Sequence, residues 1–133
     1  GAEALDMLQA MNTGHDGSLS TGHANSTKDM LSRLETMVLQ GADGLPLEAI
    51  RQQIASAVDV IVHLSRLRDK TRKTMEICEI TGYENGKIQV NPIYLFVEDE
   101  NSTLSKVSGR LLRTKNPFIN DQKLRMAGIN EEI

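Results

Sequence analysis

Residues 74–97 read Thr74-Met-Glu-Ile-Cys-Glu-Ile-Thr-Gly-Tyr83, then Glu84-Asn-Gly86, then Lys87-Ile-Gln-Val-Asn-Pro-Ile-Tyr-Leu-Phe-Val97. Asn-Gly between two strand-like runs favours a β-hairpin, because both residues accept the positive φ angles of a tight turn. Pro92 has no backbone N–H, so the second strand should lie at an edge of its sheet or contain a bulge. The sequence therefore predicts an antiparallel hairpin.

The same hairpin contains a partial likeness to a phosphate-binding loop. Gly82 and Gly86 precede Lys87, but three residues lie between the glycines instead of four, and Ile88 stands where the motif needs Ser or Thr. A phosphate-binding loop also leads from a strand into a helix, whose N-terminus meets the phosphates. We interpret this segment as a hairpin turn that does not bind nucleotide.

Upstream of the hairpin, the pattern predicts one more strand and two helices. Residues 60–65 alternate with a period of two and end in a basic turn over residues 66–73. Ser26-Thr-Lys-Asp29 has the form of a capping box, and an amphipathic pattern follows it until Gly41. Pro46 suits the first turn of a second helix. The apolar face of that helix comprises Leu47, Ile50, Ile54 and Ala57.

The two ends of the chain suggest further helices. Apolar residues recur at helical spacing over residues 2–11. Residues 98–108 are polar and predict a mobile loop, after which Asn116-Pro117 would introduce a short helix that ends near Gly128.

Length and composition exclude several classes of protein. A chain of 133 residues has room for one ordinary domain, and its formal charge of 15 − 18 = −3 gives no general reason to bind nucleic acid or an anionic membrane. Aromatic residues are 3% of the chain, so we expect an aliphatic core. Cys78 stands alone and indicates a reducing compartment, with the cytoplasm as the default. The start at Gly1, without Met, suggests a piece of something longer.

A polar segment lies between the helix predicted over residues 2–11 and the helix predicted after Ser26. It reads Gly14-His-Asp-Gly-Ser-Leu-Ser-Thr-Gly-His-Ala-Asn-Ser26. Imidazoles, hydroxyls and backbone N–H groups beside glycines are the components of an anion site. A strand over residues 18–22 would place His23 at its carboxyl end, where open α/β sheets bind ligands. Alternatively, the glycines and serines only form turns and the histidines are structural. The spacing of the histidines matches no metal motif, and no catalytic Ser–His set is recognisable.

Residues 3–26 resemble the sequence that follows the Walker B strand in type II/IV secretion ATPases, most closely the branch that serves tight-adherence (Flp-type) pili. Within them, residues 13–26 match the histidine box of that family. The similarity continues through residues 31–37 and 47–62, and Arg125-Met-Ala-Gly-Ile129 is similar to the usual family ending.

The resemblance implies an α/β fold in which residues 1–57 are the C-terminal part of a RecA-like P-loop NTPase domain, with its histidine-box strand and helices. Residues 58–133 would form an extension with a strand, a β-hairpin and a C-terminal helix. The parent protein would be a cytoplasmic hexamer that uses ATP and Mg²⁺ to drive pilin assembly or protein export. Its partners would be platform proteins of the inner membrane, which would also hold it at that membrane. It would not bind nucleic acid.

The same resemblance assigns site residues. His23 would correspond to the histidine close to the γ-phosphate and His15 to the earlier histidine that supports the site, while Thr21, Ser20 and Asn25 are weaker candidates for supporting partners. By this resemblance, the family's phosphate-binding loop, Asp box and Walker B glutamate would all precede Gly1. The chain alone is therefore expected to hold no metal and no tightly bound ATP, and to be inactive. The alternative is a non-enzymatic interaction module or adaptor that keeps this shape.

Three other features have alternative interpretations. The basic turn over residues 66–73 favours a solvated turn over a patch that binds an anion or another subunit. His63 alternates with strand residues and is interpreted as structural. Cys78 is interpreted as a packing residue of its strand and not as a reactive thiol.

Overall fold

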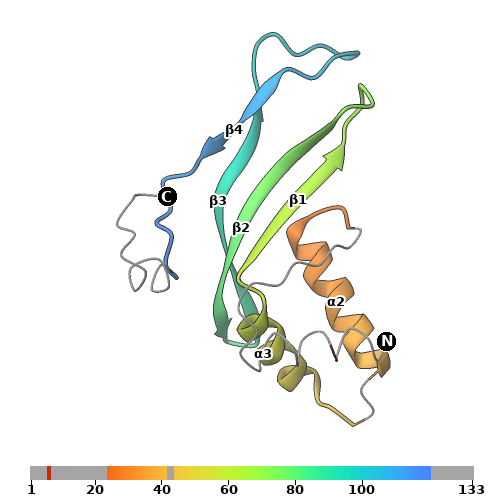
Figure 1. The fold of residues 1–133 in the computed structure, drawn as a ribbon, viewed down its shortest axis with the longest axis vertical. Coiled ribbons are helices and arrows are strands. Elements are labelled where there is room, and N and C mark those ends of the chain that lie inside the picture. The colour runs from red at the N-terminus through yellow and green to blue at the C-terminus, as the bar shows by residue number, and fades with distance from the viewer. Residues whose placement is uncertain (1–5, 7–23, 42–43, 121–133) are drawn as a thin grey trace.

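The computed structural model describes residue 6, residues 24–41 and residues 44–120. Its elements are α2 (Thr27–Gly41), α3 (Leu47–Ala57), β1 (Val60–Arg66), β2 (Arg72–Glu84), β3 (Lys87–Glu98) and β4 (Gly109–Arg113). The strands form one four-stranded sheet in the order β1-β2-β3-β4, and each strand runs antiparallel to the next. Both helices lie beside one end of the sheet, and the strands extend beyond them (Figure 1). The helix predicted over residues 2–11 lies outside the described residues.

The hairpin prediction is confirmed. Glu84 pairs with Lys87, and the two residues between them both have positive φ angles, 53° for Asn85 and 78° for Gly86. These angles suit the two-residue turn that matches the natural twist of paired strands. The segment with the partial likeness to a phosphate-binding loop is therefore the tight end of a hairpin.

Of the two alternatives that Pro92 raised for its strand, the bulge is confirmed and the edge strand is wrong, although the ladder with β4 covers residues 94–98 of β3 and does not reach Pro92. Strand β3 lies between β2 and β4. Ile77 is opposite Tyr94, and the next residue, Cys78, is opposite Pro92, so Ile93 is the extra residue of a bulge. A bulge lets an interior strand accommodate a residue that cannot donate to the ladder.

Strand β4 was missed by the sequence analysis, which ended the sheet at the hairpin. The loop before it is closed by backbone hydrogen bonds, from Asp99 N–H to the Ser108 carbonyl at 2.9 Å and from Thr103 N–H to the Lys106 carbonyl at 2.8 Å. A loop with such bonds is an ordered connection, in contrast to the mobile one that we expected. The helix predicted after Asn116-Pro117 has not begun by Asn120, and its remaining residues lie outside the described range.

Both described helices begin close to where the sequence predicted, and α2 begins with a side-chain cap. Ser26 Oγ accepts a hydrogen bond from the Asp29 N–H at 3.0 Å, as the capping box requires. The Asp29 carboxylate completes the box one residue further back than usual, because it accepts from the Asn25 N–H at 2.9 Å. We expected Pro46 in the first turn of α3. It lies one position earlier, as the N-cap residue, with φ −67° and ψ 147°.

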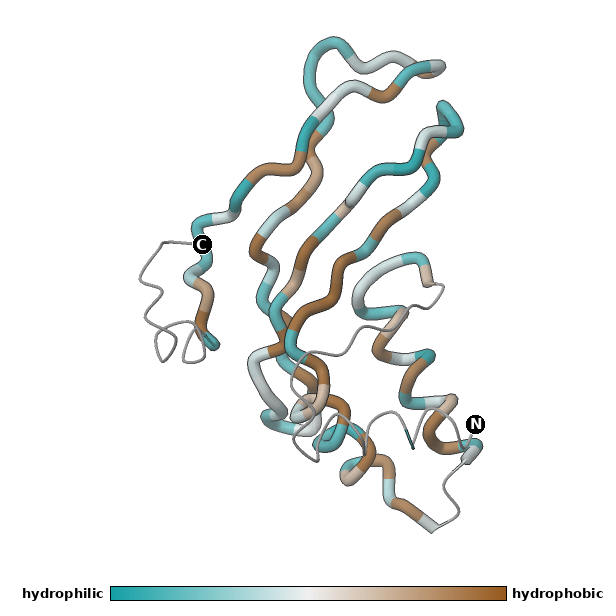
Figure 2. The backbone as a smooth tube through the Cα atoms, in the orientation of Figure 1, coloured by the Kyte–Doolittle hydropathy of each residue, from teal (hydrophilic) through white to brown (hydrophobic). Residues whose placement is uncertain are grey.

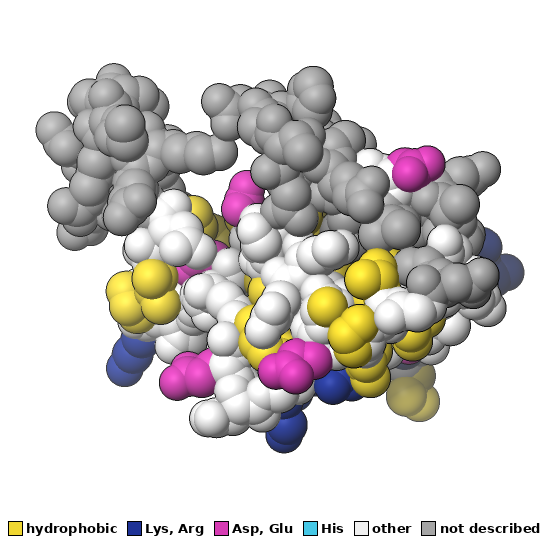
Figure 3. Space-filling model, turned by 90° about the horizontal axis from the view of Figure 1, so that it is seen from below, with side chains coloured by type: hydrophobic (Ala, Val, Ile, Leu, Met, Phe, Trp, Pro, Cys, Tyr) yellow, Lys and Arg dark blue, Asp and Glu magenta, His cyan; other side chains and the backbone are white. Residues whose placement is uncertain are grey.

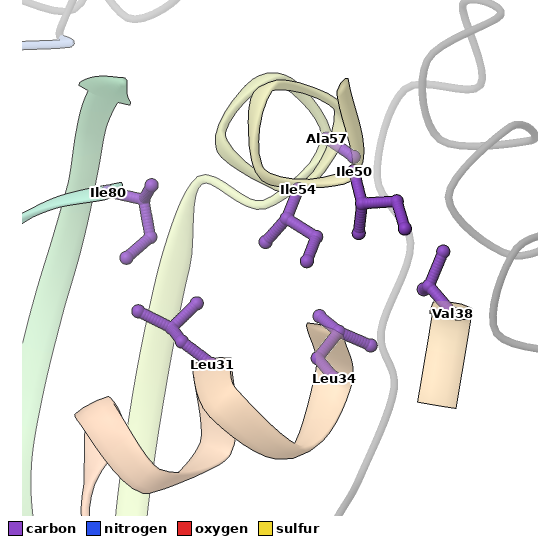
Figure 4. Close-up of a cluster of buried hydrophobic side chains, with 7 residues drawn as sticks. All are labelled: Leu31, Leu34, Val38, Ile50, Ile54, Ala57 and Ile80. Atoms are coloured by element: carbon purple, nitrogen blue, oxygen red, sulfur yellow. The ribbon is translucent and has the colours of Figure 1, made fainter. Parts of the chain in front are cut away.

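One aliphatic cluster joins the helices to the sheet. Figure 4 shows side chains of α2 and α3 directed toward one another and toward Ile80 of β2. The cluster comprises Leu31, Leu34, Val38, Ile50, Ile54, Ala57 and Ile80. It contains no aromatic side chain, which confirms the expected aliphatic core, and it draws on residues from both sides of the division we predicted at residue 57. That division stays a prediction.

Hydropathy along the backbone follows the same arrangement. Hydrophobic stretches run along the helices and the adjoining parts of the strands, and the turn between β1 and β2 is hydrophilic (Figure 2). The end with the helices exposes hydrophobic side chains between charged ones when it is seen from below (Figure 3). Exposed apolar residues of these helices are Met37, Leu39 and Leu47. No helix in the described ranges is long and apolar enough to span a bilayer.

Candidate functional site at the start of helix α2

Four of the five predicted site residues, His15, Ser20, Thr21 and His23, lie outside the described residues. Asn25 is described and is exposed. Its backbone N–H contributes to the cap of α2, whereas its side chain forms no hydrogen bond with any part of the chain that the structure describes. The described part of the candidate site is therefore the segment from Ala24 to Asp29, which directly follows His23 in the sequence.

Two strands of the sheet hold this segment by its backbone. His63 on β1 lies with Nε2 3.2 Å from the carbonyl oxygen of Ala24. A carbonyl can only accept, so the Nε2 atom carries the proton and donates it. On β2, a carboxylate oxygen of Glu76 accepts a hydrogen bond from the Thr27 N–H at 2.9 Å. The sheet thus contacts one backbone acceptor and one backbone donor within four consecutive residues.

The two anchoring side chains are cross-strand partners. His63 is directly opposite Glu76 in the β1–β2 ladder, so both side chains lie on the same face of the sheet. Burial by itself would raise the pKa of Glu76. Hydrogen bonds from Thr27 and electrostatic attraction to the nearby His63 have the larger combined effect, so the pKa lies below its usual value. The carboxylate is therefore ionised at neutral pH, beside the positive end of the α2 dipole.

Thr27 connects the helix start to a third sheet residue. Its side chain is 2% exposed, and its hydroxyl donates to the sulfur of Cys78 at 3.7 Å. Burial raises the pKa of the Cys78 thiol. A buried thiol with a raised pKa is a poor nucleophile, which supports our interpretation of Cys78 as a packing residue.

Glu76 and Thr27 were missed as candidates by the sequence analysis. One signal was available: with a period of two, Glu76 shares a face of its strand with Cys78 and the apolar Ile80. A charged residue on such a face needs a partner, but the pattern does not say which residue supplies it. Together, His63, Glu76 and Cys78 can position the backbone at the start of α2. No group of three or more potential metal-ligating side chains occurs among the described residues.

A second carboxylate holds a different segment on the opposite face of β2. Glu79 is 1% exposed, and its carboxylate accepts from the N–H groups of Ile119 at 2.9 Å and Asn120 at 2.6 Å. The side chain of Asn91 also donates to it at 3.1 Å. The segment after β4 is thereby attached to the middle of the sheet.

The basic turn between β1 and β2 is attached to the β3–β4 loop. Arg68 forms an ion pair with Glu98 at 2.6 Å and donates to the Thr103 carbonyl at 2.7 Å. Asp69 accepts from the Val107 N–H at 2.9 Å. Hydrogen bonds from the Thr71 side chain, then from the backbone of Val107 and Thr71, lower the pKa of Asp69 to about 2. The charged side chains of Arg68 and Asp69 therefore attach this turn to the β3–β4 loop.

Comparison with known proteins gives consistent matches. A profile of the type II/IV secretion system protein family matches residues 1–125. The chain is 35% identical over 96 residues to the conjugal transfer protein TrbB of Rhizobium radiobacter, a match that covers 72% of this chain and 28% of TrbB. It is 42% identical over 66 residues to the type IV secretion system protein VirB11 of Brucella suis, covering 48% of this chain and 18% of VirB11.

A Mycobacterium tuberculosis protein named for conjugal transfer is 37% identical over 94 residues, which are 71% of this chain and 26% of that protein. The chain thus spans about a quarter of the length of the curated relatives that it matches over most of its own length. Because the family profile extends from Gly1 through the capped start of α2 and the whole described sheet to residue 125, the chain belongs to the type II/IV secretion system protein family.

Proposed function

We propose that these residues are the C-terminal part of a secretion ATPase, whose full-length form couples ATP hydrolysis to the assembly of pilin or the export of protein. The observation that carries the proposal is the family match over residues 1–125, which includes the segment that resembles a histidine box. The relatives named for conjugal transfer and type IV secretion support the same class of machine.

In this proposal the polar segment before α2 contacts nucleotide. A neutral imidazole of His23 donates a hydrogen bond to a γ-phosphate oxygen or to the attacking water, and His15 supports it. Ser20, Thr21 and Asn25 are proposed as neighbouring polar partners. Loss of the γ-phosphate would remove the hydrogen-bond acceptor of His23, so the segment would distinguish ATP from ADP.

The remaining parts of the catalytic centre would come from residues outside this chain. The 133 residues contain no Gly-x-x-x-x-Gly-Lys-[Ser/Thr] motif. ATP and Mg²⁺ would therefore be held by the full-length protein. We propose that this protein belongs to the tight-adherence branch and forms a cytoplasmic hexamer that binds platform proteins of the inner membrane. The 133-residue chain by itself should not hydrolyse ATP, because positioning and charge neutralisation supply most of phosphoryl-transfer catalysis.

The test is ATP hydrolysis by the full-length protein with Mg²⁺, before and after His23→Ala. Removal of a preorganised donor to a transition-state oxygen should lower kcat about 100-fold while the melting temperature stays the same. Gln52→Ala, at an exposed position of α3, is the matched control and should keep full activity.

Two results would contradict different parts of the proposal. Absence of Mg²⁺-dependent ATP hydrolysis by the full-length protein would overturn the ATPase assignment and favour the adaptor alternative. Unchanged turnover in His23→Ala would overturn the role of the histidine and leave the ATPase assignment in place.

A further inference from the structure

We propose that Glu76 and His63 are positioning residues for the histidine-box segment, which they hold in register with the sheet at the point where the chain enters α2. The inference rests on the proposed function, in which the residue before Ala24 acts on nucleotide. It adds two residues, 39 and 49 positions away from their contacts, to the machinery of that site.

The geometry supports positioning because the two contacts fix the segment at separate points. His63 holds the Ala24 carbonyl from β1, and Glu76 holds the Thr27 N–H from β2. Two hydrogen bonds from neighbouring strands restrict both translation and rotation of the segment. Successive Cα atoms are about 3.8 Å apart, so a fixed Ala24 limits where the preceding residue can lie.

The local cap of α2 does not replace these contacts. The start of α2 already has its own cap, in which Ser26 accepts from Asp29 and Asp29 accepts from the Asn25 N–H. Glu76 adds a carboxylate that loses solvation to reach the Thr27 N–H. That cap leaves the N–H of Thr27, a buried residue in the first turn of α2, without an intrahelical partner. Glu76 supplies this partner from β2, which ties the start of the helix to one place on the sheet.

The rest of α2 makes this anchor effective. Leu31, Leu34 and Val38 are buried in the core cluster, so the body of the helix is fixed to α3 and the sheet. The start of the helix cannot shift against the sheet without breaking the bonds of His63 and Glu76. These two bonds thus define one position of the segment, and their loss should displace the preceding residue from its productive geometry.

The first experiment measures steady-state ATP hydrolysis by the full-length protein. Glu76→Ala and His63→Ala each remove one anchor, and each should lower kcat about 10-fold or more because small misplacements are costly in catalysis. The KM for ATP should change less than about twofold, since neither side chain would touch the nucleotide. Glu76→Gln keeps a carbonyl acceptor and His63→Gln keeps an N–H donor, so both should restore most of the activity.

Glu84→Ala and Ser65→Ala are the matched controls on the same two strands, and both should keep wild-type kcat. A general loss of folding would lower the melting temperature and affect the Gln variants as well. Unchanged kcat in Glu76→Ala and His63→Ala, or equal damage in the Ala and Gln variants, would overturn the proposal.

The second experiment does not depend on activity. Hydrogen exchange of the full-length protein should show faster exchange of the Thr27 amide in Glu76→Ala, while the Asp29 amide keeps the protection that Ser26 provides. Unaltered exchange at Thr27 would show that Glu76 does not hold the segment and would overturn the proposal. If the wild-type protein hydrolyses no ATP, the proposed function fails, and the exchange result alone decides whether the sheet positions this segment.

Discussion

Individual carboxylates on β2 attach distant parts of the chain to the sheet. Glu76 and Glu79 lie three positions apart on this strand and on opposite faces, and each accepts hydrogen bonds from backbone N–H groups more than 39 residues away in sequence. Glu76 contacts the start of α2, and Glu79 contacts the segment after β4. The strand therefore links the two ends of the described chain through its acidic side chains.

Replacement of Glu79 should destabilise the fold. In Glu79→Gln, an amide nitrogen takes the place of one of the two oxygens that accept from Ile119, Asn120 and Asn91. Hydrogen bonds to a charged group contribute about 1.5–3 kcal/mol, so we expect a loss of about 2 kcal/mol in the free energy of unfolding, measured by urea denaturation. Glu84→Gln, at the exposed end of the same strand, should stay within about 0.5 kcal/mol of wild type. Equal stabilities of the two variants would contradict the anchoring role of Glu79.

At the scale of elements, two glycines shape the meander for different physical reasons. Gly86 has φ +78° and open space around the position of a Cβ atom, so its conformation alone requires glycine. Gly109 opens β4, and a Cβ atom there would collide with the backbone of Val97 and Glu98 and with the ring of Phe96. One glycine permits a turn, and the other permits two strands to approach closely.

Alanine should therefore be tolerated differently at the two positions. Gly86→Ala should cost about 1 kcal/mol, the usual penalty of a left-handed backbone conformation. Gly109→Ala should cost about 1–3 kcal/mol through overpacking and should also weaken the β3–β4 pairing. Urea denaturation gives both values, and amide exchange along β4 should accelerate only in Gly109→Ala. A wild-type exchange pattern in that variant would show that the collision is relieved without loss of pairing.

For the molecule as a whole, stability depends on the interface between the helices and the sheet, here called the seam, which contains the core cluster of α2, α3 and Ile80. The far ends of the strands extend past the helices and are joined by the β1–β2 turn and the β3–β4 loop (Figure 1). Ile54 is completely buried in the seam, and Leu104 on the β3–β4 loop is 94% exposed. Two large aliphatic side chains of the same protein thus lie in opposite environments.

Truncation of these two side chains should give very different results. Ile54→Ala removes buried methyl and methylene groups and leaves a cavity, so we expect a loss of about 2–5 kcal/mol in the free energy of unfolding. Leu104→Ala removes the same kind of group from solvent and should change that value by less than about 0.5 kcal/mol. Thermal or urea unfolding of both variants measures the contrast. A small effect in Ile54→Ala would mean that the helices contribute little to the stability of the sheet.

Local sequence determined the elements that depend on near neighbours. The hairpin followed from Asn85 and Gly86, whose backbone angles are preferences of those two residues. The start of α2 followed from the capping box at Ser26, and the aliphatic core followed from periodicity and composition. Such features need only interactions between residues close in the chain, which a pattern can report. Family membership followed likewise from the sequence, over residues 1–125.

Tertiary structure alone decided the rest, because the deciding contacts join residues far apart in the chain. The pairing of β4 with β3 made the strand of Pro92 an inner strand of the sheet, and the register with β2 placed a bulge at Ile93 beside Pro92. In the candidate site, the sequence pointed to His15, Ser20, Thr21, His23 and Asn25, of which only Asn25 is described. The structure adds the contacts of His63 and Glu76, whose partners lie 39 and 49 residues away. A pattern can show that a charged residue on a strand needs a partner, and only the folded chain brings that partner within hydrogen-bonding distance.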